Sequence, residues 1–324
     1  MDIHMKGTAA LYGTPYLMTM PRSDGGVAVL AAPARHPAHA ALVTIRPHQW
    51  IKNALVFAAV AAAGVLDGDD VLPRVTVAFA AFCLLASGIY AINDVHDAAE
   101  DRRHPRKRYR PVAAGELAPR TAVALGLGLL CVGLAMCVAV APLLALTGAA
   151  YVALTLSYTL LWRRVPVLDT VAIAGGFVLR AVAGGTAAPV HLSRWFILVI
   201  SCAAVFVATG KRLAELQRTR ASRAPRRRVL EFYTPRMLRS ILAGSGAGAL
   251  FAYCVWAFSL PMIDGVAWRP LSIPPFVICL LRYQQLALGG EGEAPEELLL
   301  SDRIIQLSGL AWLVLFALGV NAAT

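Results

Sequence analysis

The feature that most constrains this chain is a series of apolar segments, each close to 20 residues long and almost free of charge. A helix needs about 20 apolar residues to cross a bilayer, and only helices and closed barrels satisfy their backbone hydrogen bonds there. The segments are continuous runs of Ala, Leu, Val and Gly without the alternation of barrel strands, and the mean hydropathy is +0.63. The sequence therefore predicts an all-α integral membrane protein.

Nine segments are candidates for membrane spans. They cover residues 50–66, 74–93, 119–141, 143–162, 166–188, 194–210, 236–260, 271–288 and 302–322. Residues 1–44 show neither helical nor alternating periodicity, and we expect them to form a flexible N-terminal tail. Residues 45–324 are then one transmembrane domain.

The loops between these segments predict the orientation of the chain. Lys and Arg gather after the second, fourth and sixth spans, at 102–110, 163–164 and 211–228. The alternate loops, at 66–73, 141–142 and 188–193, contain no Lys or Arg. Because Lys and Arg accumulate in cytoplasmic loops, the N-terminus and the basic loops are predicted to face the cytoplasm.

Three carboxylates follow one another at the cytoplasmic end of the second span, in NDVHDAAED at 93–101. Asp94, Asp97 and Asp101 are spaced by three and four residues, so they share one face of a helix. Hard oxygen ligands of this kind suit Mg²⁺ that also binds substrate phosphates. The alternative is a solvated acidic turn neutralised by nearby arginines, but a polar cluster ending an uncharged span favours a functional site.

The stretch from Asn93 to Asp101, followed by RPVAAG at 110–115, resembles the UbiA superfamily of intramembrane prenyltransferases. The resemblance extends from Arg46 to the last helix. It implies a bundle of about nine transmembrane helices, with residues 45–324 as a UbiA-type catalytic domain. It also implies that Mg²⁺ and a diphosphate are held at the cytoplasmic end.

A second motif indicates the branch of this superfamily. Members that ionise a prenyl diphosphate usually carry a second DxxxD after the sixth span, where this chain has TGKRLAELQR at 209–218. Lys and Arg bind phosphate directly, so this substitution suits a donor with a phosphate beyond its diphosphate. Together with RPHQWIKN at 46–53 and the segment 163–185, it resembles the phosphoribosyltransferase branch of actinobacterial cell-wall arabinan synthesis. That branch implies phosphoribosyl pyrophosphate as donor, decaprenyl phosphate as acceptor and the bacterial cell membrane as location, with the active site facing the cytoplasm.

The resemblance and the residue types together predict the roles of individual side chains. Asp94, Asp97 and Asp101 would hold Mg²⁺, and Asp94, Asp97 and Lys52 would be catalytic. A lysine often found in the family four residues after a tyrosine is Trp162 here, counted from Tyr158, so its role passes to Arg163 or Arg164. Lys52 and one of these arginines would orient the acceptor phosphate, Lys211 and Arg212 would hold the ribose 5-phosphate, and Glu215 would reach a ribose hydroxyl or a second metal. The predicted substrate-binding residues are Asn93, Lys107, Arg108, Arg110, Tyr158, Arg163, Arg164, Asp169, Lys211, Arg212 and Glu215.

Some partners and residues leave alternatives open. Asp169 either pairs with an arginine or contacts the donor. For Arg180, deep in the fifth span, we expect a structural ion pair in preference to a substrate contact. The net charge of +11 indicates attraction to anionic membrane lipids and not to nucleic acid. The sequence leaves the oligomeric state open, a homo-oligomer included.

Two other functions compete with the phosphoribosyltransferase. An ordinary UbiA-type enzyme, transferring a prenyl group to an aromatic acceptor, predicts a second aspartate pair near 211–215. A transporter or lipid-binding protein predicts broken helices or repeats with charges near the bilayer midplane. Here most charges lie at one face.

Overall fold

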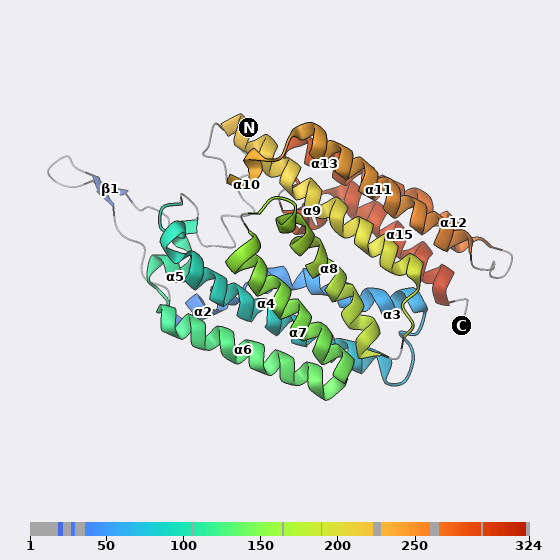
Figure 1. Cartoon of the computed structure of the whole chain (residues 1–324), viewed down its shortest axis with the longest axis horizontal. Helices are drawn as coiled ribbons and strands as arrows, with labels where there is room; N and C mark the ends of the chain where they lie inside the picture. The colour runs from blue at the N-terminus through green and yellow to red at the C-terminus, as the bar shows by residue number, and fades with distance from the viewer. Residues whose placement is uncertain are drawn as a thin grey trace. The chain divides into compact units, whose positions relative to one another are not determined.

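The structure, a computed structural model, describes residues 19–21, 27–29, 36–104, 107–163, 165–188, 190–222, 228–259, 266–292 and 294–321. These residues are mostly helical, which confirms the expected all-α class (Figure 1). A short antiparallel pair, β1 (Thr19–Pro21) and β2 (Val27–Val29), is the exception among them. The helix α2 (Pro37–Ile45) lies within the stretch expected to be a tail, so helical structure begins before residue 45.

The chain divides into two compact units. Unit 1 comprises residues 1–48 and 84–132, and unit 2 comprises residues 49–83 and 133–324. The remaining elements are η1 (Pro47–Phe57), α3 (Ala58–Ala63), α4 (Val71–Asp101), η2 (Lys107–Tyr109), α5 (Pro111–Ala114), α6 (Pro119–Val140), α7 (Pro142–Ser157), η3 (Tyr158–Trp162), α8 (Leu168–Ala187), α9 (Arg194–Ser222), α10 (Arg228–Glu231), α11 (Pro235–Phe258), α12 (Trp268–Leu271), α13 (Ile273–Gly289), α14 (Pro295–Ser301) and α15 (Arg303–Asn321).

Eight helices in the described part of the chain are long and apolar enough to cross a membrane. They coincide with eight of the nine predicted spans, from the segment 74–93 onward. The first predicted span, 50–66, falls on η1 and α3 instead. η1 is a 3₁₀-helix of 11 residues, an unusual length because 3₁₀ geometry is rarely stable beyond three or four residues.

Unit 1 is held together by small side chains. At the crossing of α4 and α6, a Cβ atom added to Gly88 would lie 2.7 Å from the carbonyl oxygen of Gly126, and one added to Gly126 would lie 2.9 Å from that of Gly88. Such close helix contacts through glycine are typical of membrane proteins. Beyond the crossing, Ala40, Ala98 and Val112 form an apolar cluster that joins α2, α4 and α5. This cluster fixes the end of α4 that carries the aspartates.

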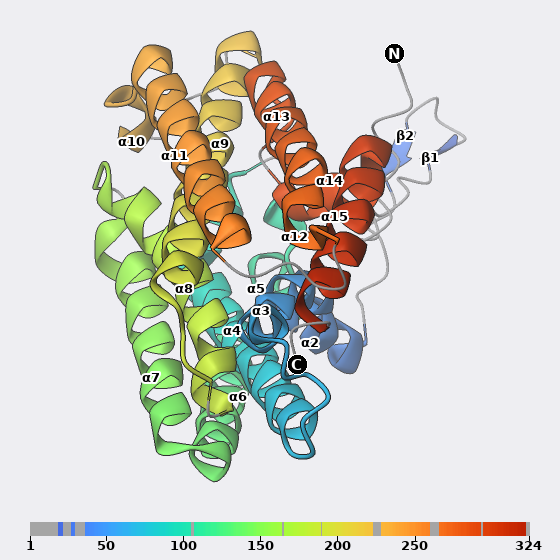
Figure 2. The same cartoon turned by 90° about the vertical axis from the view of Figure 1, so that its right-hand side faces the viewer.

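Unit 2 contains the long helices of the second half of the chain. The helices α9 and α11 lie side by side, as do α7 with α8 and α13 with α15 (Figure 2). Against α8, the backbone of η1 approaches so closely that a Cβ added to Gly184 would lie 1.8 Å from the carbonyl oxygen of Val56. The absence of a side chain at Gly184 therefore fixes the position of η1, which carries Lys52.

Candidate functional site

The aspartates on α4 lie in unit 1 and are neutralised by cations of the same unit. Asp94 and Asp101 are each 2% exposed, and Asp97 is half-buried. Arg46 forms an ion pair with Oδ1 of Asp94. Nη1 of Arg110 lies 2.7 Å from Oδ2 of Asp101 and 3.4 Å from Oδ1 of Asp94. One guanidinium group thus bridges two carboxylates that are seven positions apart on α4.

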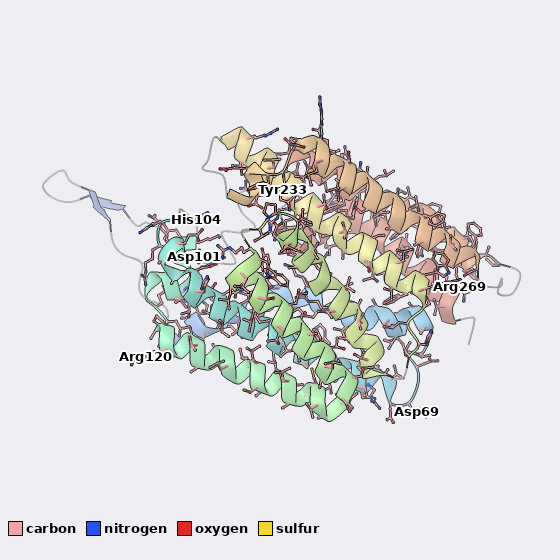
Figure 3. All side chains as sticks on the ribbon, viewed as in Figure 1. Asp69, Asp101, His104, Arg120, Tyr233 and Arg269 are labelled. Atoms are coloured by element: carbon pink, nitrogen blue, oxygen red, sulfur yellow. The ribbon has the colours of Figure 1, made fainter. Side chains whose placement is uncertain are left out.

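Local sequence explains how these cations reach the carboxylates. Arg110 is the N-cap residue of α5, where Pro111 starts the helix with a suitable backbone angle. Gly115 closes the same short helix with a positive φ of 81°, a conformation that glycine adopts without steric cost. The segment RPVAAG therefore forms a tight turn that returns Arg110 toward α4. Figure 3 shows Asp101 and His104 at this end of the unit.

Arg46 is a site residue that the sequence analysis did not assign. It follows α2 in a left-handed conformation, with φ of 53°, and its guanidinium lies over the ring of Tyr90, 4.8 Å from the centroid. Ser87 donates a hydrogen bond of 2.8 Å to the carbonyl oxygen of Ile45, which fixes the end of α2 to α4. The signal was present in the sequence, since Arg46 opens the RPHQWIKN segment.

The other two predicted cations of this loop differ from each other. Nζ of Lys107 lies 4.0 Å from Oδ1 of Asp101, at the edge of the carboxylate group. Arg108 is exposed and its Nη2 donates to the hydroxyl of Tyr109 at 2.6 Å, with the guanidinium over the ring. Lys107 and Arg110 thus face the aspartates, whereas Arg108 lies against Tyr109.

The donor atoms on α4 fit a magnesium ion held by few protein ligands. Within the described residues, no three His, Cys, Asp or Glu side chains are grouped closely enough to hold a metal, so the three aspartates do not form a preformed cage. The buried Oδ1 of Asn93 has no hydrogen-bond partner there, and it neighbours Asp94 in the chain. Mg²⁺ typically uses one or two carboxylates and completes its shell with water and phosphate oxygens. Asp94, Asp101 and Asn93 supply ligands of that type.

Arg212 in unit 2 is surrounded by acidic side chains. Its Nε lies 2.7 Å from Oδ2 of Asp169, which is an ion-pair distance, but the angles do not meet those of a hydrogen bond. Its Nη1 donates a hydrogen bond of 2.6 Å to Glu215. Its Nη2 donates to the hydroxyl of Tyr158 at 3.5 Å. Of the two alternatives for Asp169, the structure therefore shows the arginine pair. The guanidinium of Arg212 also donates hydrogen bonds to Glu215 and Tyr158.

A tyrosine before α11 completes this network. The hydroxyl of Tyr233 donates to Oδ1 of Asp169 and accepts from the backbone N–H of Val167, both at 2.7 Å. Val167 has a positive φ of 69°, which is strained for a β-branched residue and is held here by the hydrogen bond. Burial raises the pKa of Tyr233, so the hydroxyl stays protonated and able to donate. Figure 3 shows Tyr233 and Arg269 at opposite ends of α9 and α11.

Lys52 and Lys211 form a second charged group in unit 2. Nζ of Lys52 lies 3.0 Å from Oε1 of Glu296 on α14 and 2.5 Å from Oε1 of Gln49. Lys211 is within electrostatic range of both Lys52 and Glu296. Glu296 carries no recognisable motif, and only the folding of α14 against this region reveals it.

The expectation of an ion pair for Arg180 is wrong. Its guanidinium donates to the side-chain oxygen of Asn53 at 2.8 Å, to the hydroxyl of Tyr151 at 2.7 Å and to the carbonyl of Gly176 at 2.9 Å. The ring of Tyr151 also lies 4.7 Å from the guanidinium. No carboxylate in the described residues pairs with it; neutral oxygens and an aromatic face stabilise the charge instead. Arg180 therefore ties η1 to α7 and α8.

The predicted acceptor arginines follow a π-helical turn. η3 begins at Tyr158, and the backbone N–H of Arg163 donates to the carbonyl of Tyr158 at 2.8 Å. Such single π-helical turns are frequent at functional sites. Arg163 is half-buried at the end of this turn, and Arg164 lies outside the described residues.

Comparison with known proteins finds relatives that share most of the length of this chain. Relatives named decaprenyl-phosphate phosphoribosyltransferase include that of Corynebacterium glutamicum, 38% identical over 89% of each chain. The relative from Mycolicibacterium smegmatis is 41% identical over 87% of this chain and 93% of its own length. The relative from Mycobacterium tuberculosis is 40% identical over 83% of this chain and 90% of its own length.

Solved structures show the same fold at low sequence identity. A UbiA homolog from Archaeoglobus fulgidus bound to GPP and Mg²⁺ aligns with a TM-score of 0.65 at 18% identity, covering 88% of this chain and 99% of that one. Residues 53–320 match the UbiA prenyltransferase family directly. This chain is therefore an integral membrane protein that belongs to the UbiA prenyltransferase family.

Proposed function

We propose that this protein transfers the 5-phosphoribosyl group of phosphoribosyl pyrophosphate to a polyprenyl phosphate, decaprenyl phosphate in its named relatives, and releases pyrophosphate. The observation that carries the proposal is the identity of 38–41% to three phosphoribosyltransferases over most of their length. The reaction makes the protein a pentosyltransferase that supplies a lipid-linked precursor for cell-wall arabinan.

In this proposal, the leaving pyrophosphate binds near the aspartates of unit 1. Mg²⁺ held by Asp94 and Asp101, with Asp97 alongside, would neutralise negative charge on the pyrophosphate as the bond to C1 breaks. Arg110 and Lys107 lie 2.7 and 4.0 Å from the carboxylate oxygens of Asp101, so they would also lie near a pyrophosphate bound there. We assign these two cations to the pyrophosphate, Arg46 to the positioning of Asp94, and Asn93 to the metal.

In this proposal, the phosphate monoesters, which are the 5-phosphate of the donor and the head group of the acceptor, bind to the cations of unit 2. Arg212 is held by Asp169 and Glu215, so its role is to position these acids and Tyr158. Lys211 has no hydrogen bond or ion pair to any described side chain. It is therefore the cation of the TGKRLAEL segment that is available to a substrate phosphate, together with Lys52. Arg163 would orient a second phosphate.

The reaction itself needs little acid–base chemistry. A phosphate monoester is already ionised near neutral pH, so its oxygen can attack C1 of the ribose without a strong general base. One bond from C1 to oxygen breaks as pyrophosphate leaves, and another forms to the acceptor phosphate, which inverts the anomeric centre. Positioning and electrostatic stabilisation then supply most of the rate enhancement.

Both groups are proposed to face the cytoplasm. Lys and Arg follow α4 and α9, and such residues accumulate on the cytoplasmic side. A soluble, highly charged donor is then available on that side, while the polyprenyl acceptor remains in the bilayer.

A transfer assay tests the function. Purified protein in detergent with Mg²⁺ and decaprenyl phosphate receives either labelled phosphoribosyl pyrophosphate or a labelled prenyl diphosphate with 4-hydroxybenzoate. We expect label from the sugar donor to enter the lipid, and to be lost with Asp94→Asn. Transfer from the prenyl diphosphate alone would instead identify an ordinary prenyltransferase.

A further inference from the structure

Glu296 is a partly buried carboxylate that the reaction described above does not use. Its side chain is 13% exposed, and Oε1 forms the ion pair with Lys52 at 3.0 Å. The other oxygen, Oε2, is buried without a hydrogen-bond partner among the described residues. A buried carboxylate oxygen without a partner is costly, so its position needs a reason.

The fold brings Glu296 to the lysines through close backbone approaches. A Cβ added to Gly210, next to Lys211, would lie 2.5 Å from the ring of Tyr283 on α13. Gly292 belongs to the connection from α13 to α14. A Cβ added to Gly292 would lie 3.5 Å from the carbonyl oxygen of Gly210. The connection therefore passes directly over α9 at Gly210, and α14 starts immediately after it.

Lys52 and Lys211 are like charges that share Glu296. Lys211 experiences repulsion from Lys52 and attraction to Glu296, and Glu296 is in turn influenced by both lysines. Arg212 differs, because Asp169 and Glu215 already neutralise it. Glu296 thus interacts with both lysines.

Among the described residues, this group contains cations and acids in equal number. Three cations and three acids belong to it: Lys52, Lys211, Arg212, Asp169, Glu215 and Glu296. Binding of a phosphate dianion would leave the group with excess negative charge in a partly buried place, unless one acid moves away or is neutralised. Oε2 of Glu296 has neither a hydrogen bond nor an ion pair among the described residues, whereas Oδ2 of Asp169 lies 2.7 Å from Nε of Arg212. Glu296 also interacts with both lysines, so it is the one to move.

We propose that Lys52 and Lys211 form a phosphate monoester site and that Glu296 is its resident counterion, which releases the lysines when a phosphate binds. The inference rests on the proposed function for the nature of the ligand. Both the 5-phosphate of the donor and the head group of the lipid acceptor have this chemistry. Before a phosphate binds, the carboxylate would offset the repulsion between the two lysines.

The proposal makes the carboxylate a competitor of phosphate. Glu296→Gln keeps the shape of the side chain and an oxygen near Lys52 but removes the negative charge. We therefore expect a phosphate monoester to bind about tenfold more tightly to this variant, which corresponds to about 1.4 kcal/mol. The matched control is Glu297→Gln, the next residue of α14, whose side chain is exposed.

The measurement is the Kd of two ligands, ribose 5-phosphate and farnesyl phosphate, for the full chain in detergent by isothermal titration calorimetry. Tighter binding of either ligand to Glu296→Gln, with Glu297→Gln like the wild type, supports the proposal, and the affected ligand identifies the source of the phosphate. Unchanged or weaker binding of both ligands overturns it.

Two further measurements keep the result interpretable. If Glu296→Gln does not fold, Lys211→Gln serves instead; it should weaken binding of the same ligand about tenfold, and unchanged binding overturns the proposal. Transfer from phosphoribosyl pyrophosphate is assayed separately on the wild type. If Glu296→Gln changes ligand binding but the wild type shows no such transfer, the proposed function is rejected and the counterion proposal is supported.

Discussion

Nε of Arg212 lies 2.7 Å from Oδ2 of Asp169, and the two residues are only 1% and 0% exposed. This pair joins α9 to the start of α8, and Tyr233 extends it to the segment before α11. Removing one partner from a buried ion pair leaves an uncompensated charge, which is far more costly than losing an exposed pair. The pair therefore supports the part of unit 2 that holds Lys211.

Asp169→Asn should destabilise the protein by about 3–5 kcal/mol, because the guanidinium of Arg212 would keep only Glu215 as a charged partner. The measurement is the melting temperature of purified protein in detergent. Asp302→Asn is the matched control, since Asp302 pairs with Arg282 at 2.8 Å in a more exposed place. We expect a clearly smaller decrease in the control. Equal decreases would show that Arg212 does not depend on Asp169.

Asp94→Asn should lower kcat/KM for phosphoribosyl transfer about 100-fold, because the variant keeps the size of the side chain but loses the charge that holds Mg²⁺. Initial rates at several Mg²⁺ concentrations measure the effect. Asp69→Asn, in an exposed loop, should leave the rate unchanged. A variant Asp94→Asn with wild-type rates would remove Asp94 from the reaction.

Gly184→Ala should displace η1, because the new Cβ would lie 1.8 Å from the carbonyl oxygen of Val56. Backbone cannot move aside as a flexible side chain can, so we expect both a lower melting temperature and a higher KM for the lipid acceptor. Gly244→Ala is the control in the same unit, since nothing lies within 4 Å of its added Cβ. It should be neutral or slightly stabilising, because alanine favours helix. If both variants behave alike, η1 is not fixed by its contact with α8.

The ion pair of Glu296 should make stability depend on pH in the acidic range. Burial favours the protonated carboxyl. The charge of Lys52, a hydrogen bond from the backbone N–H of Glu296 and the charge of Lys211 together outweigh burial and lower the pKa of Glu296 below its ordinary value of about 4.5. A depressed pKa in the folded state means that the stabilisation is fully present above the ordinary value and is lost as the pH falls through the lowered one.

Melting temperatures of wild type and Glu296→Gln between pH 7 and pH 3 measure this contribution. The wild type should be the more stable above pH 4.5, and the difference should shrink toward pH 3. A difference that grows as the pH falls would mean that the pKa of Glu296 is raised in the folded protein and not lowered.

The sequence determined the class of the protein and the position of its membrane helices. Apolar runs long enough to cross a bilayer leave few alternatives to helices, which is why eight predicted segments coincide with helices. The spacing of Asp94 and Asp101 likewise places both carboxylates on one face of α4. The first span was less predictable, since 50–66 is apolar enough for one α-helix but forms part of η1 and the short α3. The backbone of η1 lies against Gly184 of α8, a contact that the local sequence does not indicate.

Partners that are distant in the chain were decided by the tertiary structure alone. Arg180 and Asn53 are 127 positions apart, and no local pattern indicates that a buried arginine will be stabilised by neutral oxygens. Glu296 meets Lys52 because two glycines allow the connection before α14 to pass over α9. Periodicity and motifs report local geometry and residue chemistry, whereas ion-pair partners depend on how helices pack. The sequence thus determined which side chains carry the charge, and the packing decided which of them neutralise one another.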